Sequence, residues 1–242
     1  MKTLSILAIL ILGLSWSDVL RAQSFAAGNK HATAIGAVKI NISLPDSFKN
    51  LMEDDGLKAL ALAGKAPANE LLGVYADAEA TQNAVKKGVM LPFSLRVAYM
   101  AKFRDRAITE ADLASLRRAG ESKTPAVLKP GSPEYKALVQ RLSEGLSRAT
   151  KEKVEYSVPE ITQFGIVATA PDHFTSLMLM NLSFAYSDHT VTSPFLVATT
   201  MAMVRGRLVF AITYKQFQAV EDVEAIKKFS EDWFTQLRTD NP

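Results

Sequence analysis

Four apolar runs joined by short connections fill the last third of the chain and restrict the folds that it can adopt. The runs cover residues 161–170, 177–186, 195–204 and 208–217. Turn-forming residues stand between them, as in Pro171-Asp172-His173 and Arg205-Gly206. A parallel crossover needs about a dozen residues, so strands with such short connections pair as antiparallel neighbours. The sequence therefore predicts an antiparallel meander.

The two sides of each run indicate where it lies in the sheet. Runs 177–186 and 208–217 are apolar on both sides, which is typical of central strands that are covered twice. Run 161–170 is closer to one-sided, which favours a position near an edge. Alternating residues at 38–44 and 93–103 and the apolar run 71–75 predict further strands upstream.

Helix signals lie between and after these strands. Thr109 and Asp112 form a capping-box pattern for a helix that we expect to end at Gly120, and Ser132 caps a helix over 133–149. Short helical segments are predicted after Asp46 and over 57–63, and an amphipathic helix follows Ala219, whereas 77–92 stays unassigned. The fold class predicted is α+β, with a mainly antiparallel six- to seven-stranded sheet covered by helices on both faces.

The N-terminus predicts export. Lys2 precedes an apolar run over 4–14, and small residues follow around 22–24. This pattern indicates a signal peptide over 1–22, cleaved after Ala22 or, in the second alternative, after Ser24; an uncleaved anchor is the competing interpretation. We expect a flexible leader over 23–36 and a single α/β domain over 37–242. The loop 120–132 is the only plausible internal boundary.

Composition restricts the compartment and the partners. No other stretch reaches about 18 apolar residues, so no transmembrane segment is expected after cleavage. The absence of cysteine fits a bacterial periplasmic or secreted protein. The predicted mature chain has a nearly balanced net charge of +2, with scattered cations, which argues against nucleic acid as a partner. The sequons at Asn41 and Asn181 fall in predicted strands and are interpreted as chance matches.

No recognised chemical motif is present. The chain lacks GxGxxG, P-loop, HExxH and GxSxG patterns, and His31, His173 and His189 do not have a metal-site spacing. We expect the Asp172-His173 and Asp188-His189 pairs to be exposed turn residues whose side chains do not meet. Glu53-Asp54-Asp55 is interpreted as a solvated cluster, with a calcium site as the alternative. The sequence thus predicts no catalytic, cofactor-binding or metal residue, and no cofactor.

Methionine pairs and two aromatic residues are the remaining distinctive features. Met178 with Met180, and Met201 with Met203, each share one side of a strand. Core packing is the favoured interpretation; copper(I) binding and a soft lining for an apolar ligand are the alternatives. Trp233 is expected to pack on the sheet, with Phe234 as a second core aromatic or an exposed contact.

Two segments resemble a known group. ISLPDSF (42–48) and VRGRLVFAITY (204–214), followed by the terminal amphipathic helix, look like the PsbP, Mog1 and DcrB group of α/β/α sandwich proteins. The resemblance implies a non-enzymatic accessory or binding role and supplies no catalytic residues. We therefore expect an exported soluble binding or accessory protein, with an envelope protein as a candidate partner. The alternatives are a periplasmic hydrolase whose residues only the fold brings together, and the copper(I) or apolar-ligand carrier.

Overall fold

The computed structural model describes residues 28–242 apart from 64, 66–67, 88–89, 123–128 and 130. The predicted signal peptide over 1–22 and the start of the leader therefore lie outside the described residues. Most of the loop expected at 120–132 lies outside them as well.

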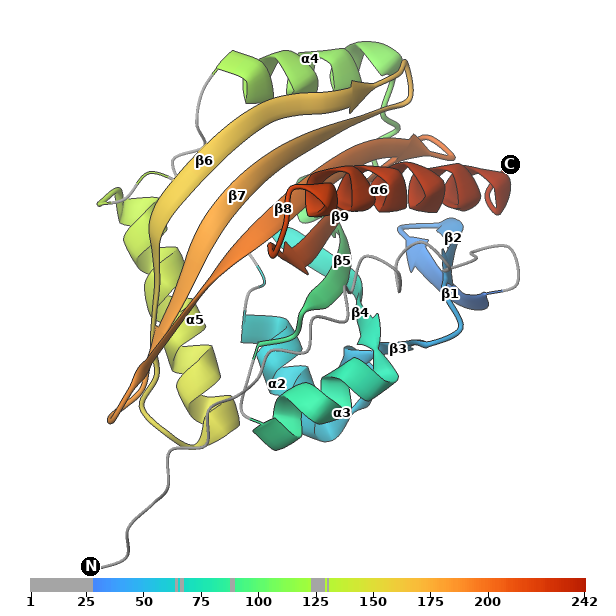
Figure 1. The fold of residues 1–242 in the computed structure, drawn as a ribbon. Helices are drawn as coiled ribbons and strands as arrows, with labels where there is room; N and C mark the ends of the chain where they lie inside the picture. Colours follow the sequence, from blue (N-terminus) through green and yellow to red (C-terminus); the bar gives the residue numbers. More distant parts are fainter. Residues whose placement is uncertain (1–27, 64, 66–67, 88–89, 123–128, 130) are drawn as a thin grey trace, which may run out of the picture.

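A seven-stranded sheet organises the chain in the order β3-β4-β5-β9-β8-β7-β6, and every neighbouring pair is antiparallel. The meander predicted for the last third is confirmed as β6 to β9, with β6 at an edge (Figure 1). The seven strands of the sheet are β3 Phe48–Asn50, β4 Asn69–Asp77, β5 Phe93–Met100, β6 Glu155–Thr169, β7 His173–Ala185, β8 Thr190–Val204 and β9 Arg207–Gln216.

A separate hairpin precedes the sheet, and it corrects the sequence prediction of a flexible leader over 23–36. Residues Asn29–Ile35 form β1, which pairs with β2, Val38–Leu44. Ile35 is buried in the main core, and Gly36 makes the turn at φ +59°. A Cβ on Gly36 would lie 2.9 Å from the Arg104 carbonyl oxygen, so the hairpin tip packs closely on that loop. Only Ile35 of β1 is buried, so the strand has no alternating apolar pattern in the sequence, and its pairing with β2 holds it in place.

Five α-helices are described: α2 Asp55–Ala63, α3 Ala78–Lys87, α4 Glu110–Ser122, α5 Pro133–Thr150 and α6 Glu221–Thr239. Both predicted caps are confirmed: the Ser132 hydroxyl accepts from the Tyr135 amide, and Thr109 and Asp112 bond reciprocally. The helix expected after Asp46 is instead β3 followed by the 3₁₀ turn η1, Leu51–Glu53. A second 3₁₀ turn, η2, covers Ala101–Phe103. Gly120 does not end α4, which continues to Ser122.

Both faces of the sheet are covered, as predicted. On one, the α6 face, helix α6 and the β1–β2 hairpin bury Trp233 and Phe234, which confirms Phe234 as a core aromatic. On the other, the α5 face, α5 packs on the β6 to β9 side, α4 packs at the end formed by the β6–β7 turn, and α2 packs beside β4. Figure 1 shows α4 and α5 at opposite ends of β6. The fold is α+β.

Among the described helices, none has both the length and the apolar character needed to cross a membrane.

Candidate functional site

A cleft of about 360 Å³ lies between α4 and the β6–β7 turn. The helix is fixed there by its capped first turn and by Leu113, which packs with Phe174 and Leu208. The cleft opens to solvent and has a mainly apolar lining. The lining residues are Glu110, Leu113, Ala114, Arg117, Thr169, Ala170, Pro171 and Phe174.

Two charged side chains give the cleft its polarity. The Nη1 of Arg117 donates a hydrogen bond to the Thr169 hydroxyl at 2.6 Å, and its Nε lies 3.9 Å from a Glu121 carboxylate oxygen. These contacts fix the guanidinium at one wall. Glu110 stands exposed in the first turn of α4. The arrangement suits a small, partly apolar molecule with a hydrogen-bonding group, since ligand sites combine an apolar surface with a few placed polar groups. Sequence reasoning missed these residues, because they meet only through the packing of α4.

The Asp–His pairs do meet side chain to side chain, contrary to expectation. In the first, His173 Nδ1 lies 3.0 Å from Asp172 Oδ1, and the imidazole packs on Phe234 with ring centroids 4.0 Å apart. Burial raises the pKa of Asp172, but hydrogen bonds from His173 and Arg238 outweigh it and hold the pKa below its usual range. Asp172 thus orients the ring and joins the β6–β7 turn to α6.

Neither pair has a nucleophile beside it. Within the described part of the chain, no hydroxyl group hydrogen-bonds to His173, and neither Asp172 nor His173 lines the cleft. His189 contacts Asp188 at 2.6 Å and stacks on Tyr186 at the exposed β7–β8 turn. General-base catalysis needs contact between base and nucleophile, so the geometry of the described residues gives these pairs no catalytic partner.

The other predicted polar candidates are dispersed. His31 lies on β1, with its Nδ1 3.8 Å from a Glu53 carboxylate oxygen. In the acidic run, Asp54 accepts from the Leu57 amide at the start of α2. Across 28–242, excluding the gaps given above, no group of three or more His, Asp or Glu residues is placed to hold a metal ion.

The methionine pairs do not converge. Met178 and Met180 pack in the α5 cluster, the apolar group beneath α5 that includes Leu146, Tyr156 and Phe195, whereas Met201 packs with α4. In the β7–β8 register, Met201 is opposite Phe174, four residues along β7 from Met178. That offset corresponds to about 13 Å along a strand, which is too far for one metal site. Met178, Met180 and Met201 therefore contribute to packing, as the favoured interpretation predicts.

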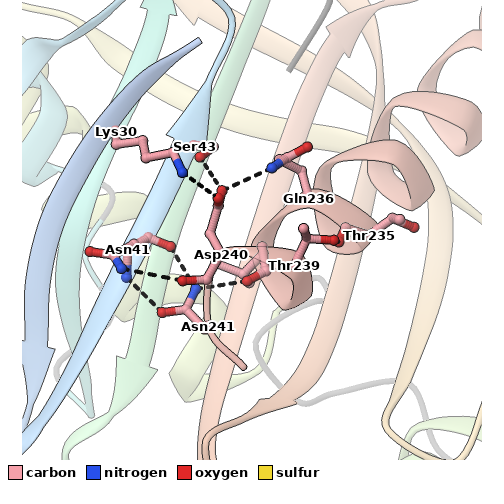
Figure 2. Close-up of polar contacts among 9 residues, drawn as sticks. Lys30, Asn41, Ser43, Thr235, Gln236, Thr239, Asp240 and Asn241 are labelled. Carbon is pink, nitrogen blue, oxygen red and sulfur yellow. Dashed lines mark hydrogen bonds and ion pairs between the residues drawn. The ribbon is translucent and has the colours of Figure 1, made fainter. Parts of the chain in front are cut away.

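A dense polar cluster joins α6 to the hairpin (Figure 2). The Asp240 carboxylate accepts from Lys30 at 2.6 Å, from Gln236 at 3.1 Å and from the Ser43 hydroxyl. Asn241 pairs with both backbone groups of Asn41, each at 2.8 Å. Burial raises the pKa of Asp240, but the Lys30, Ser43 and Gln236 hydrogen bonds lower it overall. The polar groups satisfy one another, so we assign this cluster a structural role.

Comparisons with protein-family models and with curated proteins give no match. Among solved structures, the chain resembles the Mog1 fold. The Ran-binding protein Mog1p of Saccharomyces cerevisiae has 12% identity and a TM-score of 0.32, over 89% of this chain and 93% of that one. A point mutant of Mog1 gives 12% identity and a TM-score of 0.33, over 88% and 93%. At this level the likeness concerns the fold alone.

Proposed function

We propose that the protein is an exported, non-catalytic binding protein of the bacterial periplasm or exterior, and that the cleft beside α4 holds its small-molecule ligand. The observation that carries the binding role is the cleft itself. It combines an apolar floor of Leu113 and Phe174 with a guanidinium that Thr169 holds in place. Its volume of about 360 Å³ lies within the range of small-ligand sites.

Export is supported by the N-terminal pattern and by the composition. Lys2, the apolar run over 4–14 and the small residues at 22–24 follow the order of a secretory signal, and the chain has no cysteine. The copper(I) alternative and the hydrolase alternative have no specific observation in their favour, because the methionine pairs lie apart and the histidines have no hydroxyl partner among the described residues.

Export is tested by fractionation of a Gram-negative host that produces the full chain. We expect a processed chain in the periplasm whose mass corresponds to loss of residues 1–22 or 1–24. Ile9→Lys places a charge in the apolar run and should leave the precursor inside the cell, whereas the control Thr3→Lys adds the same charge before the run and should not. Unprocessed wild-type chain in the cytosol would overturn the export proposal.

Binding is tested by ligand-observed NMR with a fragment collection. Ala114→Trp should fill the cleft and weaken the binding of its fragments at least tenfold, because Ala114 lines it. Ala111→Trp, on the exposed side of the same helix, is the matched control and should leave binding unchanged. If no fragment binds more weakly to Ala114→Trp than to Ala111→Trp, the assignment of the cleft as a ligand site is refuted. Turnover of ester, peptide or glycan substrates that is lost in His173→Ala would overturn the non-catalytic role.

A further inference from the structure

A line of half-buried side chains crosses the α5 face between the areas that α4 and α5 cover. Arg96 on β5 pairs with Ile212 on β9, Ile212 with Thr199 on β8, and Thr199 with Ser176 on β7. We call these four residues the Arg96 row. Each is partly exposed, although β9 and β8 are interior strands of the sheet. On the α4 side, Phe174 and Met201 of the next line pack with α4. On the other side the next line belongs to the α5 cluster, and Ile212 of the row itself packs against that cluster.

Arg96 carries a positive charge that nothing in the described chain neutralises. One Nη donates to the Ala61 carbonyl oxygen at 3.3 Å, while Nε is inaccessible to solvent and has no acceptor. No described carboxylate lies within ion-pair distance of it.

The residues that the structure does not describe supply no acidic counter-ion to Arg96 either. The internal gaps at 64, 66–67, 88–89, 123–128 and 130 contain no Asp or Glu, and residues 1–27 contain only Asp18, within the predicted signal peptide. Burial of an unpaired charge is costly, so a half-buried arginine without a carboxylate is suited to an external anion.

Two tyrosines of the α5 cluster lie in the same neighbourhood. Tyr156 and Tyr214 pack in the α5 cluster, and neither hydroxyl makes a hydrogen bond to another described residue. Burial, and then the proximity of Tyr214 and Tyr135, raise the pKa of Tyr156, while nearby Arg96 lowers it. Tyr135 differs from these two, because its hydroxyl donates to the Val158 carbonyl and accepts from the Val158 amide. Tyr214 lies two residues along β9 from Ile212, the register partner of Arg96, so its hydroxyl is a further hydrogen-bond donor beside the row.

We propose that the Arg96 row binds a small amphiphile with one carboxylate head and an aliphatic tail. The head bonds to the Arg96 guanidinium, whose fork of donors matches a carboxylate in shape, and one arginine balances one charge. The tail lies along Ile212 and the methyl of Thr199 towards Ser176, with Met178 beside it. The row crosses three strand spacings, about 14 Å, which gives room for an extended aliphatic tail. This site is separate from the cleft beside α4.

Isothermal titration of the mature chain with dodecanoate tests the proposal. We expect binding that Arg96→Gln weakens at least tenfold, whereas the exposed Arg148→Gln on α5 leaves it unchanged. Dodecanol supplies the same tail without the charge and should bind at least tenfold more weakly to the unmodified protein. This arm keeps the test informative if Arg96→Gln fails to fold.

Other outcomes overturn the proposal. Equal binding of dodecanol would show that the head is not recognised, and tighter binding of dodecyl phosphate would assign the site to a different anion. Absence of dodecanoate binding would refute the site itself. Ala114→Trp distinguishes this proposal from the proposed function, because it fills the cleft and should leave dodecanoate binding at the Arg96 row unchanged. Loss of dodecanoate binding in Ala114→Trp would place the ligand in the cleft instead.

Discussion

The buried ion pair between β9 and the start of α6 gives an asymmetric stability prediction. Lys215 Nζ lies 2.9 Å from Asp222 Oδ1, and the two side chains are only 5% and 3% exposed. Asp222 also accepts from the backbone amides of Gln218 and Ala219, at 2.8 and 3.1 Å, and so ties the loop before α6 to the first turn of that helix. We predict that Asp222→Ala destabilises the protein more than Lys215→Met does.

The difference follows from what each substitution leaves behind. Asp222→Ala leaves a buried ammonium with no other hydrogen-bond partner among the described residues, and it removes the acceptor of two loop amides. Breaking a buried pair in this way costs about 3–5 kcal/mol. Lys215→Met leaves a carboxylate that keeps both amide donors, so the loss is that of one charged hydrogen bond, about 1.5–3 kcal/mol. The double variant should lose less than the two single losses together, by about 1–3 kcal/mol.

Urea unfolding followed by Trp233 fluorescence measures these changes, because Trp233 is buried on α6 and becomes exposed when the helix detaches. An equal or larger loss in Lys215→Met would refute the reasoning, as would losses that add within about 0.5 kcal/mol in the double variant.

Low pH should reduce the stability that the Asp222 carboxylate contributes to the folded protein. Burial raises the pKa of Asp222, but the amide and Lys215 hydrogen bonds outweigh it and lower the pKa below that of the unfolded chain, about 3.9. A lowered carboxyl pKa stabilises the folded state above the unfolded value, and this stability is lost as the pH falls through the folded value. The gap in unfolding free energy between the wild-type protein and Asp222→Ala should therefore be full above about pH 5 and narrow below about pH 4. A gap that stays constant to pH 2.5 would contradict this.

Two further predictions concern buried polar groups. Asn241→Ala should cost about 2–3 kcal/mol in urea unfolding, since it removes the partners of both Asn41 backbone groups, and the exposed control Thr239→Ala should cost under about 0.5 kcal/mol. Tyr75→Phe should raise the thermal midpoint and add about 1 kcal/mol, because the buried Tyr75 hydroxyl has no partner in the described structure. Tyr135→Phe, which loses two hydrogen bonds, should lower the stability instead. A loss of stability in Tyr75→Phe would contradict the prediction for the unpartnered Tyr75 hydroxyl.

Much of the sheet could be predicted from local patterns. Alternation placed β2 at Val38–Leu44, apolar runs with short connections placed the meander, and capping residues placed the starts of α4 and α5. The one-sided pattern of run 161–170 correctly indicated an edge strand, now β6. These features depend on residues close in sequence, so one segment contains the whole signal.

The errors have a common cause. The segment over 29–35 has little apolar pattern, yet it forms β1, because pairing with β2 and the Lys30–Asp240 contact supply its stability from elsewhere in the chain. The Asp172–His173 contact was not expected, because Arg238 and Phe234, which hold the two side chains, come from α6, more than sixty residues later. A local pattern contains no information about such partners.

The sequence by itself determined most of the strands, the antiparallel order of the meander and the lack of recognised reactive motifs, because hydrophobic periodicity and turn chemistry act over a few residues. Only the tertiary structure decided which distant polar side chains meet and which are left without a partner. The cleft brings Arg117 beside Thr169, fifty-two residues later, and the Arg96 row is assembled from four strands. Whether a charge is solvated, paired or left without a partner depends on which distant segments exclude water from it, and that is a property of the packed chain.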